Sequence, residues 1–153
     1  MKTVYVGMSG DLIPPGHINI INHARQYGEV MVGLVTDKGV AAFKRLPVMS
    51  FEQRKIVLEH IKGVKEVVAQ ETPDYIANIE KYRPDYVVHG DDWKTTQPVI
   101  RGRVVEKLKE WGGKVIDVPY TKGISSTNFH HYLHKAGTTS EIRIERLRRL
   151  LEA

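Results

Sequence analysis

Short apolar runs alternate along the chain with segments that carry a helical period. The strand-like runs are rich in valine and cover residues 3–8, 30–36, 65–70, 85–90 and 114–120. Helical patterns occupy residues 16–26, 38–46, 50–61, 74–82, 99–111 and 128–137, and Ser50 with Gln53 forms a capping-box signature. Short apolar strands joined by helical crossovers predict an α/β fold built on a doubly wound, five-stranded parallel sheet.

Composition indicates an ordinary globular domain. The 153 residues can bury a proper core, and the apolar share of 41% and charged share of 27% are typical of such a domain. The chain has no cysteine, which excludes disulfides and argues against a structural zinc site. It also shows no secretory segment and no apolar run of membrane-spanning length, so we expect a cytoplasmic location.

The charge balance is basic. A formal net charge of +5 and a pI near 9.4 favour an anionic partner, although a solvated basic surface has the same composition. Much of the surplus lies in residues 141–153, written EIRIERLRRLLEA. We expect neither a nucleic acid nor a membrane among the partners.

Polar, glycine-bearing segments follow four of the predicted strands. They are SGDLIPPGH at 9–17, TDKGVAAFKR at 36–45, HGDDW at 89–93 and PYTKGISST at 119–127. Ligands of doubly wound sheets bind at the carboxyl ends of the strands, so these four segments predict one shared site.

Each segment has a functional and a plainer interpretation. The hydroxyls and free N–H groups of GISST can form an anion pocket at a helix start, or simply cap that helix. His17 beside Gly16 can face a ligand or cap the first helix. Lys44 and Arg45 can close over phosphates or lie in solvent. The pair Asp91–Asp92 can hold a magnesium ion or an amine, or cap a turn, and Trp93 offers a flat wall for a base or acceptor.

Common catalytic motifs are missing. The sequence contains neither GxxxxGK[ST] nor a GxGxxG after its first strand, and it lacks nucleophile elbows, paired metal histidines and cysteine motifs. A P-loop ATPase and an ordinary dehydrogenase are therefore poor fits.

Taken in order, GDLIPPGH, SFEQRK, RPDYVVHGDDW and GISST resemble the motifs of the cytidylyltransferase family of the nucleotidyltransferase superfamily. The resemblance covers almost the whole chain and implies a Rossmann-like nucleotidyltransferase fold with an extra C-terminal helix. Glycerol-3-phosphate cytidylyltransferase is a near relative. The stretches KRLPVMSFEQRK, VVHGDDWK and VPYTKGISST look closer to the cytidylyltransferase domains that accompany phosphoenolpyruvate phosphomutase in phosphonate biosynthesis, so fusion or association with that enzyme is an expectation.

The resemblance implies an activity and a set of site residues. CMP would pass from CTP, bound with Mg²⁺, to a small phosphonate such as 2-hydroxyethylphosphonate, releasing pyrophosphate. His17 and Lys44 would be catalytic, and the metal ligands are left unassigned. Nucleotide contacts would come from Ser9, Gly10, Gly16, His17, Arg45, Lys62, Tyr120, Thr121, Gly123, Ile124, Ser125, Ser126 and Thr127. Acceptor contacts would come from Asp11, Arg54, His89, Asp91, Asp92 and Trp93.

Two positions depart from the family pattern. The HxGH signature needs histidine at position 14, where this chain has Pro14, and relatives carry arginine where Tyr120 stands. Proline has no N–H and no polar side chain, so we expect weakened turnover. Two alternatives stay open: a cytidylyltransferase of the glycerol-3-phosphate type, and a nucleotide-binding domain without turnover.

The last segment predicts an association. We divide the chain into a cytidylyltransferase domain at 1–136 and an amphipathic helix at 137–153, which begins at a Thr138/Glu141 capping box and places Ile144, Leu147 and Leu151 on one face. Such a stripe would pack on the domain or across a homodimer, or lead to a further domain in longer relatives.

Overall fold

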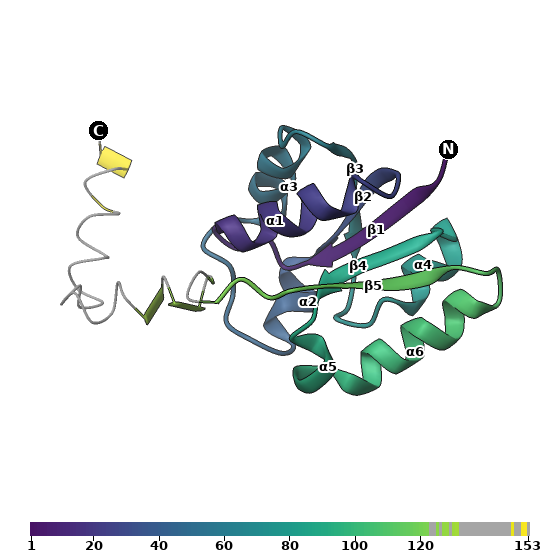
Figure 1. Cartoon of the computed structure of the whole chain (residues 1–153). Coiled ribbons are helices and arrows are strands. Elements are labelled where there is room, and N and C mark those ends of the chain that lie inside the picture. The colour runs from purple at the N-terminus through teal and green to yellow at the C-terminus, as the bar shows by residue number, and fades with distance from the viewer. Residues whose placement is uncertain (123–124, 126, 129, 132–147, 149–150, 153) are drawn as a thin grey trace.

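A five-stranded parallel sheet forms the centre of the protein in the computed structural model (Figure 1). The structure describes residues 1–122, 125, 127–128, 130–131, 148 and 151–152. The sheet order is β3-β2-β1-β4-β5, with β1 at Thr3–Met8, β2 at Glu29–Val35, β3 at Val64–Gln70, β4 at Tyr86–Gly90 and β5 at Lys114–Val118. The predicted doubly wound α/β fold is confirmed.

Helices cover both faces of the sheet. On one face, α1 (Pro15–Ala24) and α3 (Phe51–Glu59) bury Ile21, Ala24 and Leu58 against the valines of the sheet. On the other, α4 (Ile76–Tyr82), α5 (Trp93–Thr96) and α6 (Pro98–Lys109) bury Ile79, Trp93, Val104 and Leu108. The short α2 (Asp37–Ala41) follows β2. In the described part of the chain, the sheet therefore separates the apolar core into two layers, one beneath the helices of each face.

The observed elements differ from the sequence prediction at several ends. The fifth strand stops at Val118, because Pro119 has no N–H for a sheet hydrogen bond. The helix predicted for 38–46 ends at Ala41, and the four-residue α5 was not predicted. Most of the predicted 128–137 helix and of the 137–153 segment, with the Thr138/Glu141 cap, Ile144 and Leu147, lies outside the described residues, whereas Leu151 is described and exposed.

The switch point of the sheet lies between β1 and β4. From β1 the chain builds outward through β2 and β3, then returns to add β4 on the other side of β1. Such a reversal leaves a crevice outside the carboxyl ends of the two central strands, where ligands bind in this type of sheet. No helix in the described part of the chain is long and apolar enough to cross a bilayer.

A buried arginine ties these strand ends together. Arg54 of α3 has no solvent-exposed surface. Its Nη1 donates to the carbonyl of Ser9 after β1 and to that of Val35 at the end of β2, the latter at 2.9 Å. Its Nε donates to Met49 O at 3.2 Å, and its Nη2 pairs with Asp37 Oδ1 at 2.7 Å. The guanidinium therefore joins the ends of β1 and β2 to the starts of α2 and α3.

Replacing this cation is expected to destabilise the whole domain. Arg54→Ala removes the ion-pair partner of Asp37, whose half-exposed carboxylate keeps a hydrogen bond from Phe51 N. It also removes a donor from three carbonyls, and each buried acceptor left unsatisfied lowers the free energy of unfolding by about 1–3 kcal/mol. Arg54→Lys keeps the charge but cannot reach four acceptors, so it should remain destabilised. Urea denaturation measures both, with Lys55→Ala on the exposed face of α3 as the control. An unchanged midpoint for Arg54→Ala would contradict this role.

Candidate functional site

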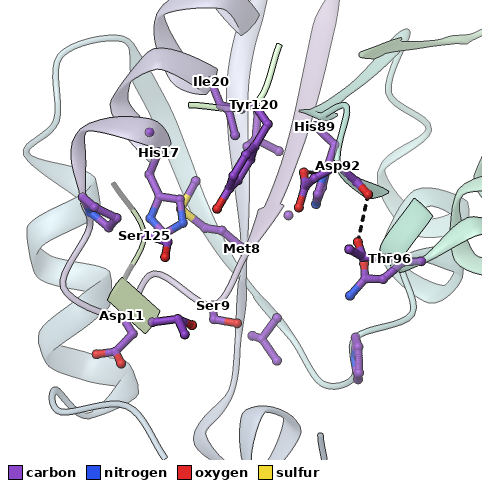
Figure 2. Close-up of a pocket in the computed structure, with 18 of the residues that line it drawn as sticks. Met8, Ser9, Asp11, His17, Ile20, His89, Asp92, Thr96, Tyr120 and Ser125 are labelled. Carbon is purple, nitrogen blue, oxygen red and sulfur yellow. Dashed lines mark hydrogen bonds and ion pairs between the residues drawn. The ribbon is translucent and has the colours of Figure 1, made fainter. Parts of the chain in front are cut away.

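A cavity of about 310 Å³ opens at the carboxyl ends of β1 and β4 (Figure 2). The sheet topology brings the four predicted segments to this edge, and each contributes to the wall. The predicted site residues that line the cavity are Ser9, Asp11, Gly16, His17, Lys44, His89, Asp92, Tyr120, Thr121, Ser125 and Thr127, and Pro14 lines it with them. Residues separated by more than a hundred positions in sequence thus share one site.

His17 presents an unpaired ring nitrogen in this cavity. It lies in the first turn of α1, and its buried Nδ1 has no hydrogen-bond partner among the described residues. Burial, together with the nearby charge of Lys44, lowers the pKa of His17 to about 4. The imidazole is therefore neutral at pH 7, and a buried polar atom without a partner is a group that a ligand can satisfy.

The loop that delivers His17 is strained. Gly10 has a φ of +66°, and Leu12 and Ile13 have φ values of 58° and 35°. The left-handed region suits glycine but is unfavourable for leucine and for β-branched isoleucine, at about 1–3 kcal/mol for each such residue. Gly10 itself packs against Leu34 and does not line the cavity.

Asp11 anchors that loop to two other segments. Its side chain is buried, with Oδ1 accepting a hydrogen bond from Val48 N at 3.1 Å and Oδ2 lying 3.0 Å from His130 Nε2. Both carboxylate oxygens are therefore engaged by the protein. His130 could not be singled out from the sequence, because it lies in no motif and contacts Asp11 only through the tertiary fold.

The hydroxyl-rich segment after β5 lies against α1. Thr121 Oγ1 accepts a hydrogen bond from Asn19 Nδ2 at 3.1 Å, and Ser125 Oγ accepts one from Asn128 N at 3.1 Å. The Ser125 hydroxyl thus accepts from the N–H three residues later, as the capping interpretation expects, and the same residue also lines the cavity. The predicted contacts of Gly123, Ile124 and Ser126 lie outside the described residues.

Fewer cations face the cavity than the sequence predicts. Lys44 is the one lysine or arginine of the described residues that lines it. The residue as a whole is exposed, and partial desolvation of its amine, together with the charge of Arg45, lowers the pKa of Lys44. Arg45 is exposed beside it. Lys62 precedes β3 and so lies at the amino edge of the parallel sheet, away from the cavity. Arg54 is interior, with its donors used by the protein. The predicted substrate roles of Lys62 and Arg54 therefore have no geometric support.

Some residues of the HGDDW segment line the cavity and others lie in the core. His89 and Asp92 line the cavity, whereas Trp93 is fully buried, stacks on His89 with ring centroids 4.3 Å apart, and donates to Asp117 Oδ1 at 2.7 Å. Asp91 Oδ1 accepts a hydrogen bond from Tyr120 N at 3.0 Å, and Asp91 does not line the cavity. Trp93 thus supports the wall from behind, and the predicted direct contacts of Trp93 and Asp91 with an acceptor are not seen in this geometry.

Other cavity residues were not singled out from the sequence. Some of them come from the segment after α2, from the end of β3 and the loop that follows it, and from the α5–α6 junction; these are Phe43, Gln70, Pro73, Tyr75, Thr96 and Gln97. Gln70 and Tyr75 hold fixed positions: Gln70 accepts from Tyr5 Oη at 2.6 Å, and Tyr75 donates to Gly7 O at 3.1 Å.

Comparisons with known proteins agree with this geometry. A protein-family model described as cytidylyltransferase-like matches residues 9–132. Over 129 residues the chain is 36% identical to a glycerol-3-phosphate cytidylyltransferase from Bacillus spizizenii, covering 83% of this chain and 93% of that protein. It is 31% identical over 137 residues to an ethanolamine-phosphate cytidylyltransferase from Arabidopsis thaliana and 34% identical over 129 residues to the bifunctional protein HldE from Magnetococcus marinus.

The matched lengths differ between these relatives. The chain spans 26% of the HldE protein and 31% of the plant enzyme, so it corresponds to one part of each. The crystal structure of a lipopolysaccharide core biosynthesis protein from Thermoplasma volcanium superposes with a TM-score of 0.65 at 20% identity, covering 80% of this chain and 98% of that one. That likeness supports the fold.

The pKa of His17 predicts a pH dependence of stability. Because the folded-state pKa of about 4 lies below the ordinary value of 6.5, only the unfolded chain takes up a proton at this ring between those pH values. The free energy of unfolding should therefore fall as pH drops from 6.5 toward 4. In His17→Gln, which lacks the titrating ring, it should fall less over the same range. Urea midpoints at pH 7 and pH 5 for both proteins measure it. An NMR titration of His17 centred near pH 6.5 would contradict it.

Proposed function

The chain belongs to the cytidylyltransferase-like family, and from this premise we propose that it transfers CMP from CTP to a small acceptor bearing a phosphonate or phosphate group. The observation that carries the proposal is the neutral His17, with its unpaired Nδ1, beside Lys44 in a cavity at the switch point of the sheet. The resemblance of the sequence motifs to cytidylyltransferase domains of phosphonate biosynthesis favours a phosphonate, and 2-hydroxyethylphosphonate is the first candidate.

The proposed reaction needs no general base. An oxygen of the acceptor is already an anion and attacks the α-phosphorus of CTP, forming a new P–O bond while the bond to the β-phosphate oxygen breaks and pyrophosphate leaves. The task of the protein is to align two polyanions and to stabilise the charge that develops on the phosphorus. Lys44 supplies a positive charge, while neutral His17 and the hydroxyls of Ser125 and Thr127 supply donors without adding charge.

Magnesium enters this proposal as part of the nucleotide. Mg²⁺ in nucleotide sites takes most of its ligands from phosphate oxygens and water, with one or two carboxylates at most. Among the described residues, no three histidine or acidic side chains converge as a protein-made metal cage would need. Mg²⁺ bound to the triphosphate would neutralise part of its charge.

Direct assays separate this proposal from its alternatives. Calorimetry with Mg·CTP tests binding, and a pyrophosphate-release screen over 2-hydroxyethylphosphonate, glycerol 3-phosphate and ethanolamine phosphate tests turnover. We expect CTP binding and turnover with at least one of these acceptors. CTP binding without turnover on any of them would favour a nucleotide-binding domain, and a preference for glycerol 3-phosphate would favour that type of enzyme.

Pro14 is expected to limit the rate. It lines the cavity where the family signature has histidine, and it supplies no donor. Removal of one preorganised transition-state donor typically lowers the rate about 10²–10³-fold. We therefore expect Pro14→His to raise kcat at least tenfold with little change in CTP affinity, because such a donor acts on the transition state.

Steady-state kinetics on Pro14→His and on the double variant Pro14→His/His17→Ala measure this effect. In the double variant turnover should be lost, because the first histidine of the signature is restored but the second, His17, is missing. No gain in kcat for a folded Pro14→His protein would overturn the assignment of position 14.

A further inference from the structure

One carboxylate of the cavity accepts no hydrogen bond. The two side-chain oxygens of Asp92 have no donor among the described residues, and the ring of His89 lies beside them with its Nδ1 3.9 Å from Asp92 Oδ1. The neighbouring carboxylates are occupied: Asp11 by Val48 N and His130, Asp91 by Tyr120 N, and Asp117 by Arg101, Trp93 and Lys94. Asp92 differs from them in being both unengaged and part of the cavity wall.

His89 does not neutralise this charge. Its Nδ1 lies 2.8 Å from the carbonyl of Gly90, which can only accept, so this nitrogen carries the proton and donates. Burial lowers the pKa of His89, which is therefore neutral at pH 7. In a neutral imidazole with a protonated Nδ1, the Nε2 is a hydrogen-bond acceptor. His89 and Asp92 thus present acceptors to the cavity and no positive charge.

The surroundings of Asp92 hold its backbone and leave room for its carboxylate. A Cβ added at Gly90 would lie 2.7 Å from Asp92 Oδ1, so the glycine leaves the room that this oxygen occupies. The hydroxyls of Thr95 and Thr96 each donate to the Asp92 carbonyl at 3.0 Å and hold its backbone at the start of α5. The side chain is 34% exposed, which leaves it accessible to a ligand.

A carboxylate without a hydrogen-bond donor or a cation beside it is unfavourable in a cavity that receives two polyanions. Figure 2 shows His17 and Ser125 on one side of the cavity and His89, Asp92 and Thr96 on the other, with Met8 between them. Lys44 lies on the His17 side, where the Asp11 carboxylate is already hydrogen-bonded by Val48 N and His130, whereas no cationic side chain of the described residues accompanies Asp92. Phosphate groups are therefore favoured on the His17 side and repelled by Asp92. The Asp92 side therefore suits the part of the acceptor that bears no phosphoryl group.

We propose that Asp92, with His89, selects a short acceptor whose end opposite the phosphonate or phosphate is a hydrogen-bond donor, either an ammonium or a hydroxyl, and rejects an acceptor with a second anionic end. The inference rests on the proposed function and names the substrate class of the same site. A hydrogen bond to a charged group contributes about 1.5–3 kcal/mol, which corresponds to roughly a tenfold to hundredfold preference.

Four acceptors of matched length test the selection. They are 2-aminoethylphosphonate, 2-hydroxyethylphosphonate, propylphosphonate and phosphonoacetate, which end in an ammonium, a hydroxyl, a methyl and a carboxylate. We expect kcat/KM with Mg·CTP to be at least tenfold higher for the ammonium or the hydroxyl than for the methyl, and lowest for the carboxylate. Comparison of 2-aminoethylphosphonate with 2-hydroxyethylphosphonate shows which of the two donors, ammonium or hydroxyl, is preferred. Calorimetric Kd values measured with CTP present give the same ranking without requiring turnover.

Asp92→Asn removes the charge while keeping one oxygen acceptor. In this variant kcat/KM for 2-aminoethylphosphonate should fall at least tenfold, and kcat/KM for 2-hydroxyethylphosphonate should fall less. For phosphonoacetate kcat/KM should rise, because the repelling charge is gone. Asp91→Asn is the matched control: it removes the same charge one residue away, outside the cavity wall, and should leave the ranking of the four acceptors unchanged. Thermal melting confirms that both variants fold.

The outcomes separate this inference from the proposed function. Equal Kd values for the four acceptors, binding of none of them, or an unchanged ranking in Asp92→Asn would overturn the selection. A loss in Asp92→Asn that is equal for all acceptors and is restored by more Mg²⁺ would also overturn it, because Asp92 would then serve the metal. Ranked binding without pyrophosphate release would instead contradict the proposed transfer and leave the selection supported.

Discussion

The structure depends on the buried guanidinium of Arg54. A cation in the interior is tolerated only when its donors are satisfied, and here four hydrogen bonds fix their acceptors at the ends of β1 and β2 and at the starts of α2 and α3. The cavity wall is built on these same segments: Ser9 follows β1, and Lys44 lies between α2 and α3. The hydrogen bonds of Arg54 therefore hold the core together at the carboxyl ends of β1 and β2 and also position the residues of the cavity wall.

Charge divides the cavity into two parts. Two phosphoryl-bearing substrates must meet there, yet Lys44 is the one cationic side chain of the described residues on its wall. In the proposed reaction, neutral donors and Mg²⁺ bound to the nucleotide would supply the rest of the stabilisation, since preorganised dipoles stabilise developing charge. The Asp92 carboxylate, which no cation of the described residues accompanies, would then orient the substrates, because phosphoryl groups bind more favourably on the side of the cavity away from it.

Sequence patterns predicted the sheet and the edge where the site lies, but not which side chains face the cavity. Valine-rich runs mark strands, and polar segments after parallel strands must meet at one edge. Whether Trp93 faces the cavity or the core depends on packing with Asp117, 24 residues away. The interior position of Arg54 could have been predicted, because it lies four positions before the buried Leu58 and both therefore share the core face of α3. Lys62 could have been excluded because it precedes its strand.

Pro14 alters the site in two opposing ways. Its φ of −68° and ψ of 164° are the values that proline prefers and that a helix N-cap needs, and Pro15 occupies the next position, where a missing N–H is harmless. The Pro14 carbonyl still accepts from His17 N at 2.9 Å, so the start of α1 is held in the shape that delivers the imidazole. Proline therefore stiffens the backbone while removing a donor from the cavity. Because histidine adopts the same φ and ψ without strain, the loop is compatible with either residue, and the difference between them lies in the chemistry of the side chain.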